Sequence, residues 1–203
     1  TVKLKAVKNI FQDTLAVAYR LYIMKWYDED HVIPKVINGK KLTEAIILAG
    51  GEGTRLRPLT NNMPKALISV HDKTITEHIF DLLKKHGITN VTLSVGYMKE
   101  KIKNYFGDGS KFGLEINYIE EDEPLGTAGP LRLAKKFDRT FIVSNGDELK
   151  DIDIKDMYDF HKKNSALATI ALTNVEDPSQ YGVAKLNGNK IIEFIEKPKK
   201  EDA

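Results

Sequence analysis

The chain of 203 residues contains no cysteine. Disulfides, zinc–thiolate centres and thiol nucleophiles are therefore excluded, and the absence suits a reducing compartment. No apolar run approaches the roughly 20 residues that a membrane-spanning helix needs. The first residues also lack the apolar core and small-residue cleavage site of a signal peptide. We therefore expect a cytoplasmic protein without a membrane partner.

The sequence also lacks a strong excess of either charge. It carries 31 Lys and Arg residues against 29 Asp and Glu residues, a formal net charge of +2 at pH 7. This balance gives no basic surface field of the kind that attracts nucleic acid, so we expect no nucleic-acid partner. The five histidines are scattered without metal-ligand spacing, and we assign them no role. The length allows one good-sized domain with an appendage.

The first 40 residues differ in pattern from the rest of the chain. Apolar residues recur there at helical spacing, which predicts an amphipathic helix over Val7–Tyr27. The acidic run Asp28–Asp30 and then Pro34 should end this helix. Two interpretations stay open: an extra packing helix or remnant of a neighbouring domain, and a helix that binds a partner. We treat residues 1–40 as a helical extension of unknown role.

From Leu42 onward, apolar runs typical of strands alternate with amphipathic stretches typical of helices. The expected strands are Leu42–Ala49, Asn90–Val95, Leu114–Ile119, Thr140–Ser144, Ala166–Thr173, Val183–Leu186 and Ile191–Ile195. The expected helices are Thr74–Lys85, Lys99–Phe106, Thr127–Lys136 and Ile154–Asn164. Asn187-Gly188, between the last two strands, is a strong hairpin signal. The alternation predicts an α/β domain over residues 41–203, with three αβα layers and a mostly parallel sheet.

The most informative stretch is Ile46–Pro58, which reads IILAGGEGTRLRP. Its apolar run ends abruptly in Gly50-Gly51-Glu52-Gly53. Glycines let the backbone turn with positive φ and approach a ligand closely. Successive N–H groups in such a turn form an anion site, and a nearby arginine adds planar donors. Since ligands collect beyond the carboxyl ends of parallel strands, the stretch predicts a phosphate cradle there.

Three interpretations of this glycine loop compete. A P-loop needs G-x-x-x-x-G-K-[ST], and no stretch of the chain supplies it. A dinucleotide fingerprint needs G-x-G-x-x-G; Gly51 and Gly53 fit its first two places, but the third falls on Leu56. For the glycines alone, a simple strand-to-helix turn stays open. The longer stretch LAGGEGTRLRPLTNNMPKAL matches a far more specific pattern.

That pattern resembles the signature of the sugar-1-phosphate nucleotidylyltransferases, also called NDP-sugar pyrophosphorylases. The resemblance runs from about Leu42 to Lys197 and includes SVGYMKEKIKNYFGDGSKFG and EPLGTAG, which are most similar to mannose-1-phosphate and heptose-1-phosphate guanylyltransferases. It implies a Rossmann-like nucleotidyltransferase domain. Four further blocks follow in the family's order: EDEPLGTAGPL (Glu121–Leu131), VSNGDELKDID (Val143–Asp153), YGVA (Tyr181–Ala184) and EFIEKP (Glu193–Pro198).

The resemblance implies transfer of a nucleoside monophosphate, GMP from GTP, to a sugar-1-phosphate such as mannose-1-phosphate, with release of pyrophosphate. Two anions must be brought together, so positioning and fixed positive charge are the main requirements. No protein nucleophile is needed, because the sugar phosphate is already ionised. The alternative is a non-catalytic regulatory or assembly subunit of the same fold that binds a nucleotide sugar.

By the same resemblance, the catalytic residues are Arg55, Lys65 and Asp147. Arg55 would contact the departing β- and γ-phosphates, and Lys65 would neutralise the α-phosphate and the incoming sugar phosphate. Asp147 follows an apolar strand and offers a hard carboxylate suited to Mg²⁺, the expected cofactor. The role of Arg57 stays open between phosphate contact and solvent exposure.

The implied nucleotide site joins the glycine loop to a base-recognition loop. The implied sugar site has a carboxylate for sugar hydroxyls and a lysine for the phosphate, at Gly182, Glu196 and Lys197. The nucleotide-binding residues are Leu48, Ala49, Gly50, Gly51, Gly53, Thr54, Arg55, Lys65, Leu125, Gly126 and Thr127.

The resemblance does not cover the whole family domain. The chain ends at Ala203, six residues after Lys197, and is therefore C-terminally short relative to the family. An open sheet edge favours association with another chain. We therefore expect a homo-oligomer, or a domain completed by another chain.

Overall fold

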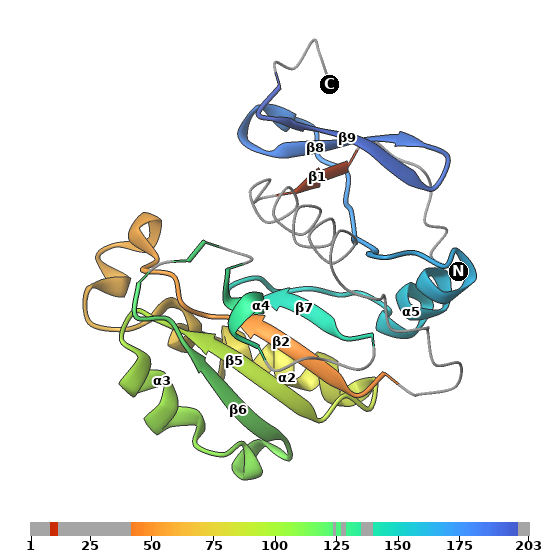
Figure 1. Ribbon diagram of the computed structural model, residues 1–203. Coiled ribbons are helices and arrows are strands. Elements are labelled where there is room, and N and C mark those ends of the chain that lie inside the picture. The colour runs from red at the N-terminus through yellow and green to blue at the C-terminus, as the bar shows by residue number, and fades with distance from the viewer. Residues whose placement is uncertain (1–8, 12–41, 124, 127–128, 135–139, 199–203) are drawn as a thin grey trace. The chain divides into compact units, whose positions relative to one another are not determined.

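The computed structural model describes residues 9–11, 42–123, 125–126, 129–134 and 140–198 (Figure 1). It divides into two compact units, which we describe separately. The sheet unit is Ile33–Tyr158, and the hairpin unit combines Thr1–Val32 with Asp159–Ala203.

Four parallel strands form the centre of the sheet unit. Their order is β6-β5-β2-β7, and every neighbouring pair is parallel. Ala45, Ile46 and Ile47 on β2 are all buried, as expected for a strand covered on both faces. The predicted α/β architecture with a mostly parallel sheet is thus confirmed. The strands are β2 (Glu44–Leu48), β5 (Asn90–Val95), β6 (Glu115–Glu120) and β7 (Ile142–Asn145).

Helices cover both faces of this sheet. α2 (Ile75–Lys85) and α3 (Lys99–Phe106) lie on one face, since right-handed crossovers from β2 to β5 and from β5 to β6 step in the same direction. The aromatic rings of Phe80 on α2 and Phe106 on α3 meet edge to face, with their centroids 5.1 Å apart. The connection carrying α4 (Pro130–Leu133) runs back from β6 to β7, and Figure 1 shows α4 across the opposite face from α2.

The order of the strands produces a topological switch point beside β2. β2 is first in sequence among the four, with β5 and β6 on one side and β7 on the other. The chain first extends the sheet from β2 toward β5 and β6 and later adds β7 on the opposite side of β2, and ligands bind at such switch points. Gly146, directly after β7, donates its N–H to the carbonyl of Leu48 on β2 at 2.8 Å. The fold thus brings the glycine loop and the segment around Asp147 to the same edge of the sheet.

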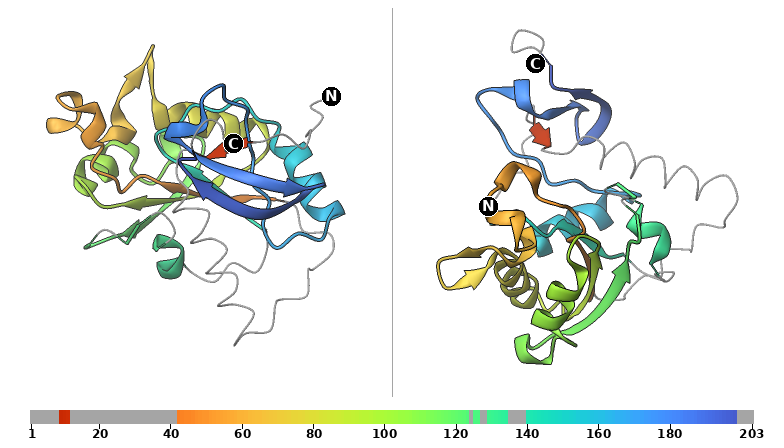
Figure 2. Two further views of the ribbon diagram at one scale, coloured as in Figure 1. Left: turned by 90° about the horizontal axis from the view of Figure 1, so that it is seen from above. Right: turned by 90° about the vertical axis from the view of Figure 1, so that its left-hand side faces the viewer.

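The hairpin unit contains a three-stranded antiparallel sheet in the order β1-β8-β9 (Figure 2). The predicted hairpin is confirmed, with its turn one residue later than the Asn187-Gly188 signal placed it: Asn187 ends β8, and Gly188, with φ of 60°, and Asn189 form the turn to β9. Among the described residues, no helix is both long and apolar enough to cross a membrane. The strands are β1 (Asn9–Phe11), β8 (Gly182–Asn187) and β9 (Lys190–Glu196), and α5 (Ile154–Lys163) precedes β8 in the chain.

Three sequence-based predictions of elements need correction. Inside the predicted helix Val7–Tyr27, residues Asn9–Phe11 form a strand, because antiparallel pairing with β8 gives their backbone groups partners; the rest of that stretch lies outside the described residues. The predicted strand Ala166–Thr173 is wrong: it contains only an isolated bridge residue, and Leu167 is 58% exposed, so the segment does not face a core. The helix predicted over Thr127–Lys136 ends at Leu133, because Ala134 is extended.

The start of α2 is fixed by a reciprocal pair of hydrogen bonds. The Thr74 hydroxyl accepts from the Glu77 N–H at 3.2 Å, and the Glu77 carboxylate accepts from the Thr74 N–H at 2.6 Å. This capping box satisfies two donors that a helix start leaves open.

Thr74→Ala should therefore lower the free energy of unfolding by about 1 kcal/mol, because the cap acceptor is lost. Thr74→Ser is the matched control: serine and alanine both lack the threonine methyl, so their difference in urea unfolding reports the hydroxyl alone. Equal stability of the two variants would contradict the assigned cap.

Candidate functional site

Within the described part of the chain, the glycine loop has two carbonyls that accept hydrogen bonds and three N–H groups without an acceptor. The Gly50 carbonyl accepts from the Tyr97 N–H at 3.0 Å, and the Gly53 carbonyl accepts from the Thr60 hydroxyl at 2.8 Å. Among the residues that the structure describes, the N–H groups of Gly51, Glu52 and Gly53 have no acceptor. Gly51 and Glu52 are exposed to solvent. Unpaired N–H groups of this kind suit an anion, and the phosphate cradle stays a prediction.

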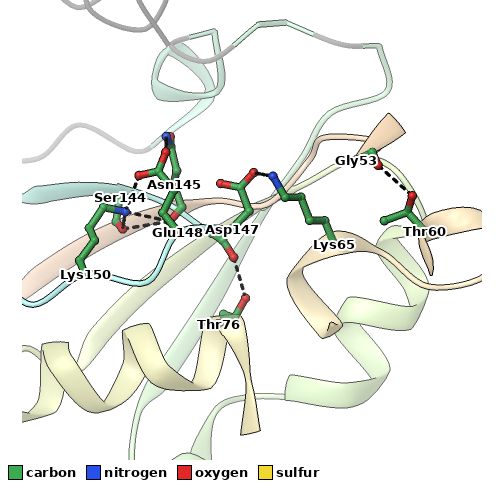
Figure 3. A network of polar contacts seen from close by, with 10 residues as sticks. Gly53, Thr60, Lys65, Thr76, Ser144, Asn145, Asp147, Glu148 and Lys150 are labelled. Carbon is green, nitrogen blue, oxygen red and sulfur yellow. Dashed lines mark hydrogen bonds and ion pairs between the residues drawn. The ribbon is translucent and has the colours of Figure 1, made fainter. Parts of the chain in front are cut away.

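Lys65 lies beside this loop and reaches the end of β7. It begins the short 3-10 helix η3 (Lys65–Leu67), where Pro64 sets the approach with φ of −65°. The Lys65 ammonium donates to the Asp147 carboxylate, although the two residues are 82 positions apart (Figure 3). Their side chains are 29% and 32% exposed, so a ligand can reach both. The structure thus brings two of the three predicted catalytic residues into contact.

Gly146 allows the contact between Lys65 and Asp147. It is buried, and a Cβ built on it would lie 2.9 Å from the Leu48 carbonyl and 3.1 Å from the Ile47 side chain. Only glycine therefore lets the chain leave β7 so close to β2. Asp147 follows at once and is directed toward Lys65.

The carboxylate of the next residue, Glu148, has different partners. Glu148 accepts a hydrogen bond from the Asn145 amide at 2.9 Å and lies 3.0 Å from the Lys150 ammonium. Burial raises the pKa of the Glu148 carboxyl, but the Asn145 hydrogen bond and the Lys150 charge outweigh it and leave the pKa below its ordinary value. Figure 3 shows Asp147 turned to Lys65 and Glu148 turned to Lys150. The two neighbouring carboxylates therefore have separate partners.

Glu121 holds the predicted base-recognition loop. One of its carboxylate oxygens accepts from the buried Ser94 hydroxyl at 2.7 Å, and the other accepts from the Leu125 N–H at 3.3 Å. A Cβ on Gly50 would come within 2.8 Å of the same carboxylate, so Gly50 leaves the room for it. Glu121 opens the EDEPLGTAGPL block but was not among the predicted site residues.

The other predicted nucleotide residues are placed as follows. Arg55 is the middle residue of the 3-10 helix η1 (Thr54–Leu56), which directly follows Gly53. The Arg55 side chain lies outside the described part of the structure. Thr127 also lies outside the described residues, whereas Gly126 has φ of 72°. Arg57 pairs with Glu52 at 3.6 Å, and both side chains are more than half exposed, which is a weak surface interaction.

The predicted sugar residues belong to the hairpin unit and meet within it. Gly182 on β8 lies opposite Glu196 on β9, and the Lys197 N–H donates to the Tyr181 carbonyl at 2.8 Å. The Lys197 ammonium is 3.9 Å from the Glu196 carboxylate, and both side chains are more than half exposed. Glycine, carboxylate and ammonium thus gather at one end of the hairpin.

Protein groups alone do not form a metal cage in the described part of the chain, where no three His, Cys, Asp or Glu side chains gather around a common point. Magnesium does not require one, since it binds through one or two carboxylates together with phosphate oxygens and waters. A single hard, partly exposed carboxylate such as Asp147 fits that donor set.

Comparison with known proteins identifies the family. The family model described as "Nucleotidyl transferase" matches residues 44–203. The chain belongs to the nucleotidyl transferase family. A mannose-1-phosphate guanyltransferase of Yarrowia lipolytica is 44% identical over 165 residues, which cover 76% of this chain and 45% of that protein. The mannose-1-phosphate guanylyltransferase catalytic subunit beta of Danio rerio is 41% identical over 162 residues, with the same coverage of each chain.

The fold agrees with solved structures of similar proteins. The crystal structure of HddC from Yersinia pseudotuberculosis superposes with a TM-score of 0.64 at 27% identity, covering 77% of this chain and 70% of that one. The chain therefore has the Rossmann-like architecture that the sequence predicted. It spans about 45% of the length of the curated relatives that it matches.

The backbone of Gly53 gives a testable consequence for this nucleotidyl transferase fold. Gly53 has φ of 63°, and an added Cβ would lie 2.9 Å from the Thr60 side chain. Gly53→Ala should lower the free energy of unfolding by at least about 1 kcal/mol, through left-handed strain and this clash. Gly51→Ala is the matched control, because a Cβ there meets nothing within 4 Å. Urea unfolding of both unliganded variants checks this; equal stability would show that the Gly53 turn relaxes freely.

Proposed function

We propose that this chain carries the nucleotide site of a sugar-1-phosphate nucleotidylyltransferase that transfers GMP from GTP to mannose-1-phosphate and releases pyrophosphate. One observation carries the proposal: a cation and a carboxylate, Lys65 and Asp147, meet beside a turn whose N–H groups are open. The names of the 40–44% identical relatives support guanine and mannose-1-phosphate as the substrates.

The transferred group passes from one anion to another, so the site must hold both and stabilise the charge that moves onto pyrophosphate. The open N–H groups of Gly51 and Gly53 bind the β- and γ-phosphates in this proposal. Arg55 follows in the chain and adds its charge to the same phosphates. Lys65 neutralises the α-phosphate and the incoming sugar phosphate. This ammonium is held by Asp147 in the unliganded site.

Asp147 is the residue that would hold Mg²⁺. The ion, when bound, supplies further positive charge to the phosphates. The chain contributes one carboxylate, already placed at the switch point by Gly146, and keeps the neighbouring Glu148 engaged by Asn145 and Lys150.

The remaining parts of the substrates are assigned to the loops that the sequence singled out. Leu125, Gly126 and Thr127 receive the base and ribose, on a loop that Glu121 anchors. Gly182, Glu196 and Lys197 receive the sugar phosphate. The family likeness of these blocks supports both assignments.

We also propose that the chain works in an assembly, either as a homo-oligomer or with another chain. The relative from Danio rerio is named as a catalytic subunit, which supports such an arrangement. Sedimentation of the purified chain, with and without nucleotide, measures its state of association.

Pyrophosphate release by the purified chain tests the reaction. The four common nucleoside triphosphates are paired with mannose-1-phosphate, glucose-1-phosphate and a heptose-1-phosphate in the presence of Mg²⁺. The proposal expects the fastest release with GTP and mannose-1-phosphate. Tight binding of GDP-mannose without pyrophosphate release from any pair would instead indicate the non-catalytic subunit.

Lys65→Ala should lower turnover by at least about 10²-fold, the scale for removing one donor to the transition state. Lys73→Ala is the matched control, since Lys73 pairs on the surface with Asp81 at 2.6 Å and should leave turnover unchanged. Steady-state pyrophosphate release checks both variants. A near-normal rate for Lys65→Ala would remove this lysine from the mechanism.

Asp147→Asn should shift the midpoint of the Mg²⁺ titration of activity upward by about tenfold or more, because the carboxylate charge on the metal is lost. Glu148→Gln changes the neighbouring carboxylate in the same way and should leave that midpoint in place. An unchanged titration for Asp147→Asn would locate the metal elsewhere.

A further inference from the structure

A buried hydroxyl lies behind the Lys65–Asp147 contact. Thr76, near the start of α2, is 0% exposed. Its Oγ1 lies 3.0 Å from the Ala66 carbonyl and 3.3 Å from the Gly146 carbonyl. Figure 3 shows Thr76 beneath Asp147, with its hydroxyl directed up toward the turn.

The two carbonyls belong to the two turns that carry the site. Ala66 directly follows Lys65 in η3, and Gly146 directly precedes Asp147 after β7. A hydroxyl has one hydrogen, so it donates mainly to Ala66 and shares a weaker contact with Gly146. One side chain therefore contacts the main chain beside both members of the pair.

Thr76 itself is held firmly. The capping box of Thr74 and Glu77 fixes the first turn of α2, and Ile75 and Ile79 are buried in the core. The Lys65 and Asp147 side chains, by contrast, rise from short turns and are about one third exposed. A rigid helix thus supports two less regular segments, the arrangement that a precise site needs.

We propose that Thr76 is a positioning residue that sets the spacing of Lys65 and Asp147 and so aligns the phosphate transfer. The inference rests on the proposed function for its catalytic consequence. Its structural consequence is independent: without the Thr76 hydroxyl, the two turns separate and the Lys65–Asp147 contact loosens.

The kinetic experiment compares Thr76→Val, which keeps the shape but removes the hydroxyl, with Thr76→Ser, which keeps the hydroxyl. Thr76→Val should lower kcat by at least about tenfold, since small misplacements at a reacting centre are costly. The KM values for GTP and mannose-1-phosphate should change by less than about threefold, because ground-state binding is retained. Thr76→Ser should restore kcat to within about threefold of the starting protein.

Thr92→Val is the matched control for the substitution. Thr92 lies half-buried on β5, away from both turns, and its change should leave kcat unaltered. If Thr76→Val does not fold, Thr76→Ala takes its place, because the smaller side chain introduces no new contact. A folded variant without the hydroxyl and with normal kcat would overturn the inference.

A double-mutant cycle separates positioning from simple structural support. In a Lys65→Ala background, Thr76→Val should cost less than about threefold in kcat, because residues that act as one unit are not additive. A full and additive loss in that background would show that Thr76 acts independently of Lys65, which would also overturn the inference.

Crystal structures of the unliganded protein and of Thr76→Val report the Lys65–Asp147 contact without reference to activity. Loss of the contact in the variant supports the positioning role, even if the starting protein releases no pyrophosphate and the proposed function fails. An unchanged contact in the variant would refute the role, even if the starting protein is an active transferase.

Discussion

The contact between the Lys65 ammonium and the Asp147 carboxylate is the interaction on which the candidate site depends. It joins two turns that are 82 positions apart, and it exists because β2 lies between β5 and β7 in the sheet. Both side chains are about one third exposed, so the pair adds at most about 1 kcal/mol to stability. Its importance is therefore positional: it holds a cation and an anion at the switch point of the sheet, where the triphosphate and the metal would compete for them.

Much of this arrangement follows from local features of the sequence. The apolar run of β2 and the glycines after it predict a buried strand followed by a tight turn, and both are present because short-range sterics decide them; the anion site in that turn stays a prediction. The Thr74–Glu77 cap and the turn between β8 and β9 are equally local. The family resemblance implied catalytic roles for Lys65 and Asp147 but no contact between them; the parallel sheet explains why the two residues meet.

Other features could not be predicted because they depend on distant partners. Glu121 acquires its role from Ser94, 27 positions earlier, and Thr76 acquires its role from Gly146, 70 positions later. The segment Asn9–Phe11 is a strand because β8 pairs with it. The spacing of its apolar residues favoured a helix, since that spacing carries no information about a distant partner. Conversely, the apolar residues of Ala166–Thr173 suggested a strand, yet Leu167 is exposed and no ladder forms there. Pairing, rather than propensity, decides these segments.

Hydrogen bonds from Tyr97 and Thr60 hold two carbonyls of the glycine loop. Tyr97 contributes twice, through its N–H to the Gly50 carbonyl and through its hydroxyl to the Thr60 carbonyl at 3.3 Å. Thr60 in turn donates to the Gly53 carbonyl. Turning either carbonyl toward a ligand would break a hydrogen bond in a partly buried position, at a cost of about 1 kcal/mol. The unliganded loop therefore keeps the Gly50 and Gly53 carbonyls engaged and, among the described residues, leaves N–H groups unpaired, which supports the proposed anion site.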